Sequence, residues 1–91
     1  MSNSGAADIG QSLAMMRKLL EQIVQTLVIK PESVRVSAGL QEDGAHKLTI
    51  TVDSQDLGKV IGKNGQTIKA IRLLVNAIKS DQFNILVDVT A

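Results

Sequence analysis

The amino-acid sequence predicts one α+β domain whose elements follow the order α-β-β-α-α-β. Apolar residues recur every three or four positions in two separate stretches, which is the spacing of amphipathic helices. Three other short segments alternate apolar and polar residues, as half-buried strands do. At 91 residues the chain has room for a single domain.

The first helix is expected over residues 9–29. Asp8, followed three residues later by Gln11, fits an N-terminal cap, and Pro31 stops the helix because the residue before a proline avoids helical dihedral angles. Residues 1–8 are expected to form a flexible tail, and 9–91 the domain. The apolar stripe is interpreted as core packing, with a dimer seam as the alternative; it comprises Ile9, Leu13, Met16, Leu20, Ile23 and Leu27.

Two strands joined by a polar hairpin loop at 39–45 are expected next. Their apolar residues alternate at Val34, Val36 and Ala38, and then at Leu48, Ile50 and Val52.

In the second half of the sequence we expect a short helix at 55–61, a loop at 62–65, a helix at 66–79 and a closing strand at 83–89. Asp53 or Ser54 would cap the short helix. The third helix has an apolar face of Ile68, Ile71, Val75 and Ile78, and a polar stripe of Lys69, Arg72, Asn76 and Lys79.

The composition narrows the possible functions. The chain has no cysteine and a single histidine, His46, so disulfides, thiolate chemistry and the usual zinc clusters are not expected. No nucleophile–base pair stands out, and we expect neither an enzyme nor a cofactor. Without a secretory signal or a membrane-spanning apolar run, we expect a soluble cytoplasmic protein.

Charge is concentrated in one region, although the net charge is only +1. Residues 56–80 carry one acidic residue, Asp56, against five basic ones, which suits a small nucleic-acid footprint. The basic residues are Lys59, Lys63, Lys69, Arg72 and Lys79.

A glycine-flanked loop lies in this basic region. Gly62 and Gly65 enclose Lys63 and Asn64, with a predicted helix on each side. Glycine permits the backbone angles of a tight turn and lets a sugar-phosphate strand approach closely. The following helix turns its unpaired N–H groups and positive dipole end toward the loop. Lys63 adds charge there, and Lys59 and Lys69 stand about one turn before and after. The arrangement predicts binding to an anionic backbone.

The run from Val60 to Ile68 resembles the signature of KH domains, whose GxxG loop clamps single-stranded nucleic acid. The element order resembles the bacterial type II arrangement. The segments 30–34, 56–60 and 70–72 are similar to the small stand-alone bacterial KH proteins of the KhpA family. The resemblance covers about residues 9–90.

The resemblance implies a type II KH fold, a three-stranded mixed sheet with its helices packed on one face and its second and third strands parallel. It implies that Val60, Ile61, Ile68 and part of the second strand line a groove for about four bases of single-stranded RNA. The single aromatic residue, Phe83, falls in a register that looks buried, so base stacking on aromatics is not expected. It further implies an RNA chaperone or post-transcriptional regulator, and a homodimer or a heterodimer with a larger KH-containing protein.

Alternatives stay open at several positions. The GxxG loop could be a plain structural turn in a protein-interaction module with little RNA affinity. The polar stripe from Lys69 to Lys79 could be a solvated helix face, with Lys69 the best candidate for RNA. Ala70, Leu73 and Ala77, with Leu74, could be an association surface or the edge of the core. A P-loop is rejected because the glycine spacing is one residue short and Asn64 replaces the Mg²⁺-binding Ser/Thr.

Overall fold

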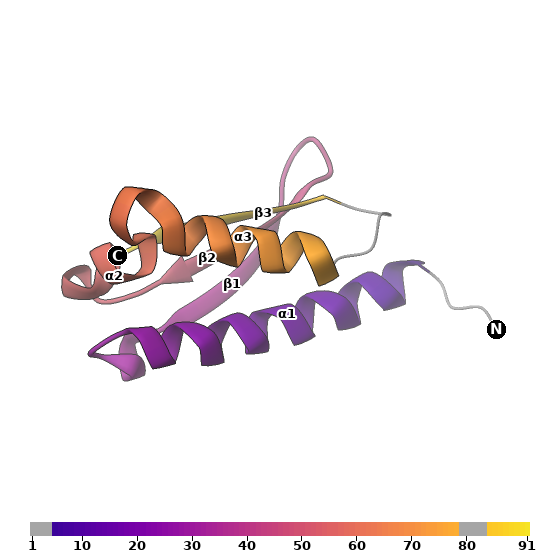
Figure 1. The fold of residues 1–91 in the computed structure, drawn as a ribbon. Helices are drawn as coiled ribbons and strands as arrows, with labels where there is room; N and C mark the ends of the chain where they lie inside the picture. Colours follow the sequence, from indigo (N-terminus) through magenta and orange to yellow (C-terminus); the bar gives the residue numbers. More distant parts are fainter. Residues whose placement is uncertain (1–4, 79–83) are drawn as a thin grey trace.

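The computed structural model describes residues 5–78 and 84–91 and has the expected α+β architecture (Figure 1). Its helices are α1 (Gly5–Leu27), α2 (Leu57–Ile61) and α3 (Gln66–Ile78), and its strands are β1 (Arg35–Leu40), β2 (His46–Thr51) and β3 (Ile85–Thr90). Single 3₁₀ turns at Pro31–Ser33, Ser54–Asp56 and Lys63–Gly65 connect them. The α-β-β-α-α-β order is confirmed.

The three strands form one mixed sheet in the order β1-β2-β3. β1 and β2 are an antiparallel hairpin in which Arg35 pairs with Thr51. β2 and β3 run parallel, with His46 opposite Ile85. A parallel pair needs a crossover connection, and α2 and α3 supply it. The mixed sheet implied by the KH resemblance is thus confirmed.

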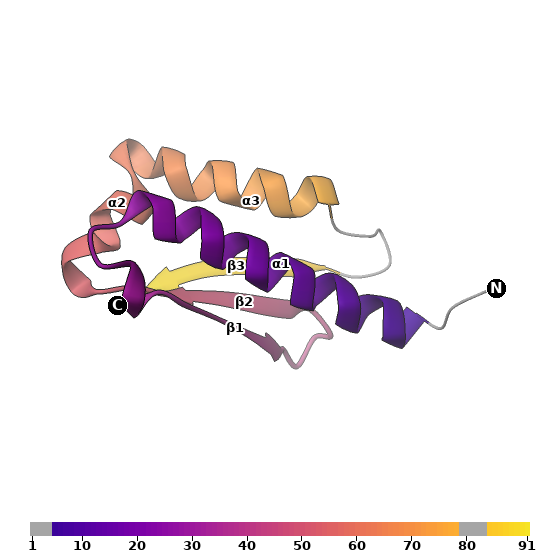
Figure 2. The same ribbon diagram turned by 90° about the horizontal axis from the view of Figure 1, so that it is seen from below.

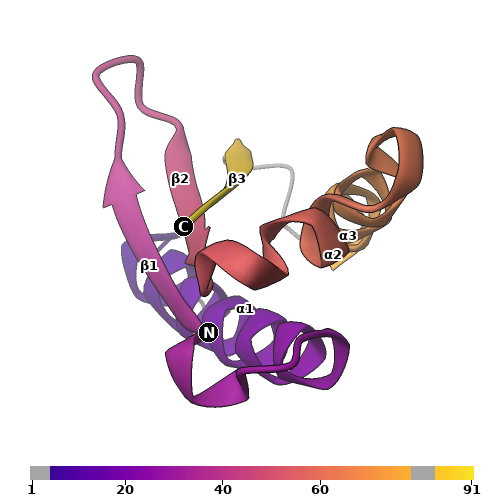
Figure 3. The ribbon, with the colours of Figure 1, turned by 90° about the vertical axis from the view of Figure 1, so that its left-hand side faces the viewer.

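The helices cover one face of the sheet, and the core lies between the two layers (Figures 2 and 3). Leu48 and Ile50 of β2 are fully buried on that face, whereas Lys47 and Asp88 lie on the opposite face, 3.7 Å apart as an ion pair. The core cluster comprises Met16, Leu20, Val24, Val34, Leu48, Ile50, Val52, Val60, Ile68, Ile71, Val75, Ile85 and Val87.

The first helix differs from the prediction at both ends. It begins at Gly5, so residues 5–8, expected in the flexible tail, are helical, and it ends at Leu27 rather than near residue 29. The helix ends four residues before Pro31. The backbone N–H groups of Ile29 and Lys30 donate to the Asp56 side chain instead of to carbonyl groups of the helix. Val24 occupies the core, while Leu27 is exposed.

Three expectations about the outer elements need correction or fall outside the described residues. β1 extends to Leu40, into the segment expected to be loop, and Ala38 is exposed because this strand leaves the core toward its tip. Ile78, expected on the apolar face of α3, is exposed in the last turn. Phe83 and Lys79 lie outside the described residues.

Among the described helices, none has the length and apolarity needed to cross a membrane.

Candidate nucleic-acid interface

The loop between α2 and α3 has an unusual backbone. Gly62 adopts φ 79° and ψ 170°, Asn64 adopts φ 56° and ψ 26°, and Gly65 has φ 72°. The Gly62 angles lie in a region essentially restricted to glycine, and asparagine is among the few other residues that enter the left-handed region readily. The GxxG segment is therefore built from residues that its turn requires, including Asn64, which sequence analysis did not single out for this reason.

Close packing against α3 also requires a glycine at the start of the loop. A Cβ atom added to Gly62 would collide with the Thr67 side chain and lie 2.8 Å from the Thr67 backbone nitrogen. The Gly62 N–H also donates to the Gly58 carbonyl at 2.8 Å, which closes the last turn of α2. Gly62 thus joins the end of α2 to the first turn of α3.

Basic side chains surround the loop as predicted. Lys59, Lys63 and Lys69 are all exposed. Lys69 extends toward the loop, because a Cβ on Gly65 would lie 4.0 Å from its Cε atom. The 13-residue helix α3 begins directly after Gly65, so its positive end adds to these charges. The three lysines predicted to contact an RNA backbone are thus exposed, and Lys69 lies next to the loop.

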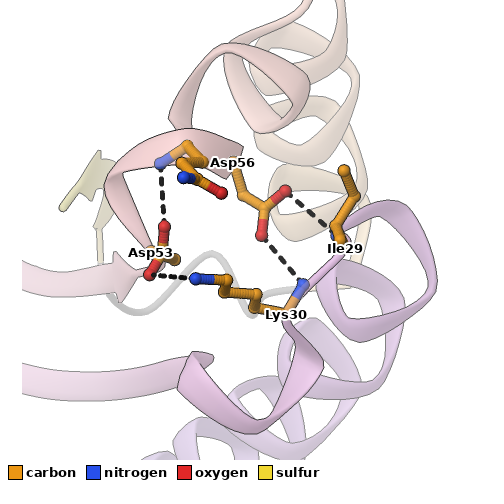
Figure 4. A network of polar contacts seen from close by, with 5 residues as sticks. Ile29, Lys30, Asp53 and Asp56 are labelled. Carbon is orange, nitrogen blue, oxygen red and sulfur yellow. Dashed lines mark hydrogen bonds and ion pairs between the residues drawn. The ribbon is translucent and has the colours of Figure 1, made fainter.

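A buried carboxylate fixes the segment that leads into the loop (Figure 4). Asp56 has no exposed surface, and its two carboxylate oxygens each accept a hydrogen bond at 3.0 Å, from the backbone N–H groups of Ile29 and Lys30. Close by, Asp53 caps the turn by accepting from the Gln55 N–H, and its Oδ2 lies 3.6 Å from Lys30 Nζ. The C-terminal end of α1 is thereby tied to the start of α2.

The surroundings of Asp56 lower the pKa of its carboxyl below the ordinary value. The hydrogen bond from the Ile29 N–H is the largest cause of the lowered pKa. The bond from the Lys30 N–H and the positive charges of Lys59 and Lys30 lower the pKa further, whereas desolvation by burial raises it. Sequence analysis named Asp56 as the single acidic residue of the basic region and as part of a segment similar to the KhpA family, but it missed this role. The bonds join residues 26 and 27 positions apart, a pairing that periodicity does not reveal.

Two residues expected to line an aliphatic groove next to the loop are buried in this structure. Val60 has no exposed surface and Ile68 only 6%, and both belong to the core. Val60 therefore offers a base no surface in this structure, and Ile68 offers very little. Ile61 is half-buried and stays accessible in part. Val60 and Ile68 therefore support the loop from beneath.

The structure instead offers a hollow between α3 and the outer edge of β3. Its volume is about 260 Å³, and it is lined by Arg72, Asn76, Ile85, Leu86 and Val87. Arg72 and Asn76 lie three and seven residues after Lys69, so the three side chains share one side of α3.

Arg72, in the middle of the predicted basic stripe, lies against the edge of β3 at this hollow. Arg72 Nε donates a hydrogen bond of 3.1 Å to the Val87 carbonyl. Sequence analysis left two interpretations of Arg72 open, a solvated helix face and an RNA contact. It placed the groove for bases at the second strand, as the KH resemblance implied. The contribution of β3 could not be anticipated because the residues it brings to Arg72 lie 13 to 15 positions along the chain.

Comparisons with known proteins place the sequence among described families. The family described as KhpA/KhpB, KH domain, matches residues 17–89. A Thermotoga maritima protein named RNA-binding protein KhpA is 39% identical over 74 residues, 81% of this chain and 97% of that protein. Its namesake from Oceanobacillus iheyensis is 44% identical over 66 residues, 72% of this chain and 87% of that protein.

A solved structure of Era in complex with MgGDPNP and part of 16S ribosomal RNA matches with a TM-score of 0.46 and 19% identity, over 82% of this chain and 30% of the Era chain. The family match spans most of the sequence, and the relatives named KhpA align over nearly their whole length. The chain therefore belongs to the KhpA/KhpB family of KH domains.

Proposed function

We propose that this protein binds single-stranded RNA, holding the phosphate backbone at residues 62–65 and receiving bases in the α3–β3 hollow. The observation that carries the proposal is the loop itself. It has three positive-φ residues, an exposed Lys63, and the N-terminus of α3 directly behind it. The names of the relatives as RNA-binding proteins support the same function.

The two parts of the site divide the work. Side-chain-free backbone at Gly62 and Gly65 lets the strand approach, and Lys63, with Lys59 and Lys69, neutralises phosphates. Bases would reach the hollow through contacts with Leu86, Ile61 and the polar groups of α3. A grip of this kind, limited in area and without aromatic stacking, suits an RNA chaperone or a post-transcriptional regulator that releases its RNA readily.

The experiment that tests the loop is a charge reversal with a matched control. Lys63→Asp combined with Asn64→Asp places two carboxylates where a phosphate should bind, and aspartate tolerates the left-handed angles of residue 64. Lys18→Asp combined with Gln22→Asp changes the net charge equally at exposed positions of α1.

Mobility shifts with a short single-stranded RNA should show binding abolished in the loop variant and retained in the α1 variant. Thermal melting should show both proteins folded. Undiminished affinity in a folded loop variant would overturn the binding site proposed here.

A second candidate function, a module that pairs with another copy of the chain, is favoured by exposed apolar side chains. Met15 is 73% exposed and, with Leu19 and Ile78, borders a hollow of about 410 Å³. Leu73 is 70% exposed, and Ala70 and Ala77 beside it are exposed too, so this line is not the edge of the core.

Sedimentation of wild type, Met15→Lys and Leu73→Lys would test the pairing. A dimer that one of these variants dissociates without loss of RNA binding would show that association and RNA binding use separate surfaces. A wild type that is monomeric at high concentration would exclude self-association.

A further inference from the structure

Arg72 is held in a fixed position at the outer edge of β3. In the parallel pairing, His46 N–H donates to the Asn84 carbonyl, so even-numbered carbonyls of this strand face β2. The odd-numbered Val87 carbonyl therefore faces away from the sheet, where Arg72 Nε donates to it at 3.1 Å. Because the guanidinium group is planar, this bond restricts the directions in which its two Nη groups can point.

The Arg72 side chain brings only donors to the hollow. Within residues 5–78 and 84–91 the Nη groups of Arg72 donate to no protein acceptor, and a guanidinium has no acceptor of its own. At the strand edge the Val87 carbonyl accepts from Arg72, and the Ile85 carbonyl, which is also odd-numbered, faces the same way. Asn76 carries both donors and an acceptor and does not discriminate by itself. The remaining lining, Ile85 and Leu86, adds apolar contacts.

The two Nη groups of Arg72 can donate side by side to a base that presents two neighbouring acceptors on one edge. Guanine offers O6 and N7, and cytosine offers O2 and N3. On the corresponding edges of adenine and uracil, each acceptor has a donor or a carbon as its neighbour. Single-stranded RNA exposes both the Watson–Crick and the Hoogsteen edges.

We propose that Arg72 makes the α3–β3 hollow select cytosine and guanine over uracil and adenine. The inference rests on the proposed RNA binding and adds a base preference to it. A bidentate pair of this kind discriminates roughly 5- to 150-fold against the wrong base.

Fluorescence titrations with four labelled hexanucleotides test the preference: oligo(C), oligo(U), oligo(A) and alternating AG. Wild type should bind oligo(C) about tenfold more tightly than oligo(U), and the AG hexamer more tightly than oligo(A). Arg72→Lys keeps the charge but loses the planar fork, so its affinity for oligo(U) should stay within about twofold of wild type while both ratios fall toward one. Lys69→Ala is the matched control and should weaken all four RNAs equally.

The possible outcomes separate this inference from the function beneath it. Equal wild-type affinity for all four RNAs, abolished by the Lys63→Asp and Asn64→Asp exchange, would overturn the role of Arg72 and leave RNA binding intact. Ratios that persist in folded Arg72→Lys would also overturn it. A wild type that binds none of the four RNAs would overturn both. If Arg72→Lys does not fold, the wild-type ratios decide alone.

Discussion

Gly62 and Thr67 lie so close together that no side chain fits between them. A Cβ on Gly62 would lie 2.8 Å from both the backbone nitrogen and the Cβ of Thr67. The first glycine of the GxxG loop therefore determines how α3 follows α2.

Replacing Gly62 with alanine should destabilise the protein. The φ of 79° and ψ of 170° alone cost about 1–3 kcal/mol for a residue with a Cβ, and the collision with Thr67 adds to this. For a domain of this size each kcal/mol lowers the Tm by about 4–8 °C. Thermal melting followed by circular dichroism measures the change.

Gly58→Ala is the matched control for this prediction. A Cβ at Gly58 would meet no atom within 4 Å, and the residue lies in α2. Alanine there should be neutral or stabilising by about 0.4–1 kcal/mol. Similar Tm losses in the two variants would contradict the role assigned to the Gly62–Thr67 contact.

Asp56→Asn should lower the free energy of unfolding at neutral pH. It should also make that free energy depend less on pH in the acidic range. An amide has one acceptor oxygen for two backbone N–H groups, so either Ile29 or Lys30 would lose its partner. Asp53→Asn should change stability little, because asparagine caps as well as aspartate.

The pH dependence follows from the direction of the Asp56 pKa shift. The pKa is lowered on folding, so the stabilisation is complete above the unfolded value of about 3.9 and disappears as the pH falls through the folded pKa below it. Urea unfolding of wild type at a series of pH values from neutral to 3 should show a loss of stability at the acid end that Asp56→Asn lacks. Equal acid dependence in both proteins would contradict the assignment.

The sequence identified the elements and the loop because both are encoded locally. The alternation of Leu48, Ile50 and Val52 marks a strand buried on one face, and all three are buried. Gly62 to Gly65 are neighbours in the chain, so their turn can be inferred from spacing alone.

Features that depend on distant residues were not predictable in this way. The KH resemblance implied that Val60 lines the RNA groove, and in a five-residue helix periodicity cannot decide which side faces the core. Likewise the Asp56 bonds and the hollow at Arg72 exist only once α1 and β3 have packed against the α2–α3 unit.

Single-stranded RNA should bind more tightly than a duplex of the same sequence. The α3–β3 hollow needs free base edges, and an A-form helix presents a deep, narrow major groove that side chains do not enter. Competition of labelled single strand by unlabelled single strand or blunt duplex gives the comparison directly. A duplex that competes equally well would indicate a simple electrostatic patch.

The salt dependence of binding should show that only a few phosphates are contacted. The loop offers Lys63, the N-terminus of α3, and the flanking Lys59 and Lys69, so about two to four phosphates are neutralised. For single strands log K falls by about 0.7 per phosphate for each unit of log salt, which predicts a slope of roughly −1.5 to −3.

Variants show which residues make these contacts. Lys63→Ala should make the slope shallower by about 0.7, because one phosphate contact is lost. Lys18→Ala on α1 should leave it unchanged, and so should Lys79→Ala at the far end of the basic stripe. Arg72→Lys should also keep the wild-type slope, since a side chain that contacts a base releases no counterion from the backbone. A slope of −4 or steeper that is insensitive to Lys63 would place the backbone contacts on a broad basic surface rather than on the loop.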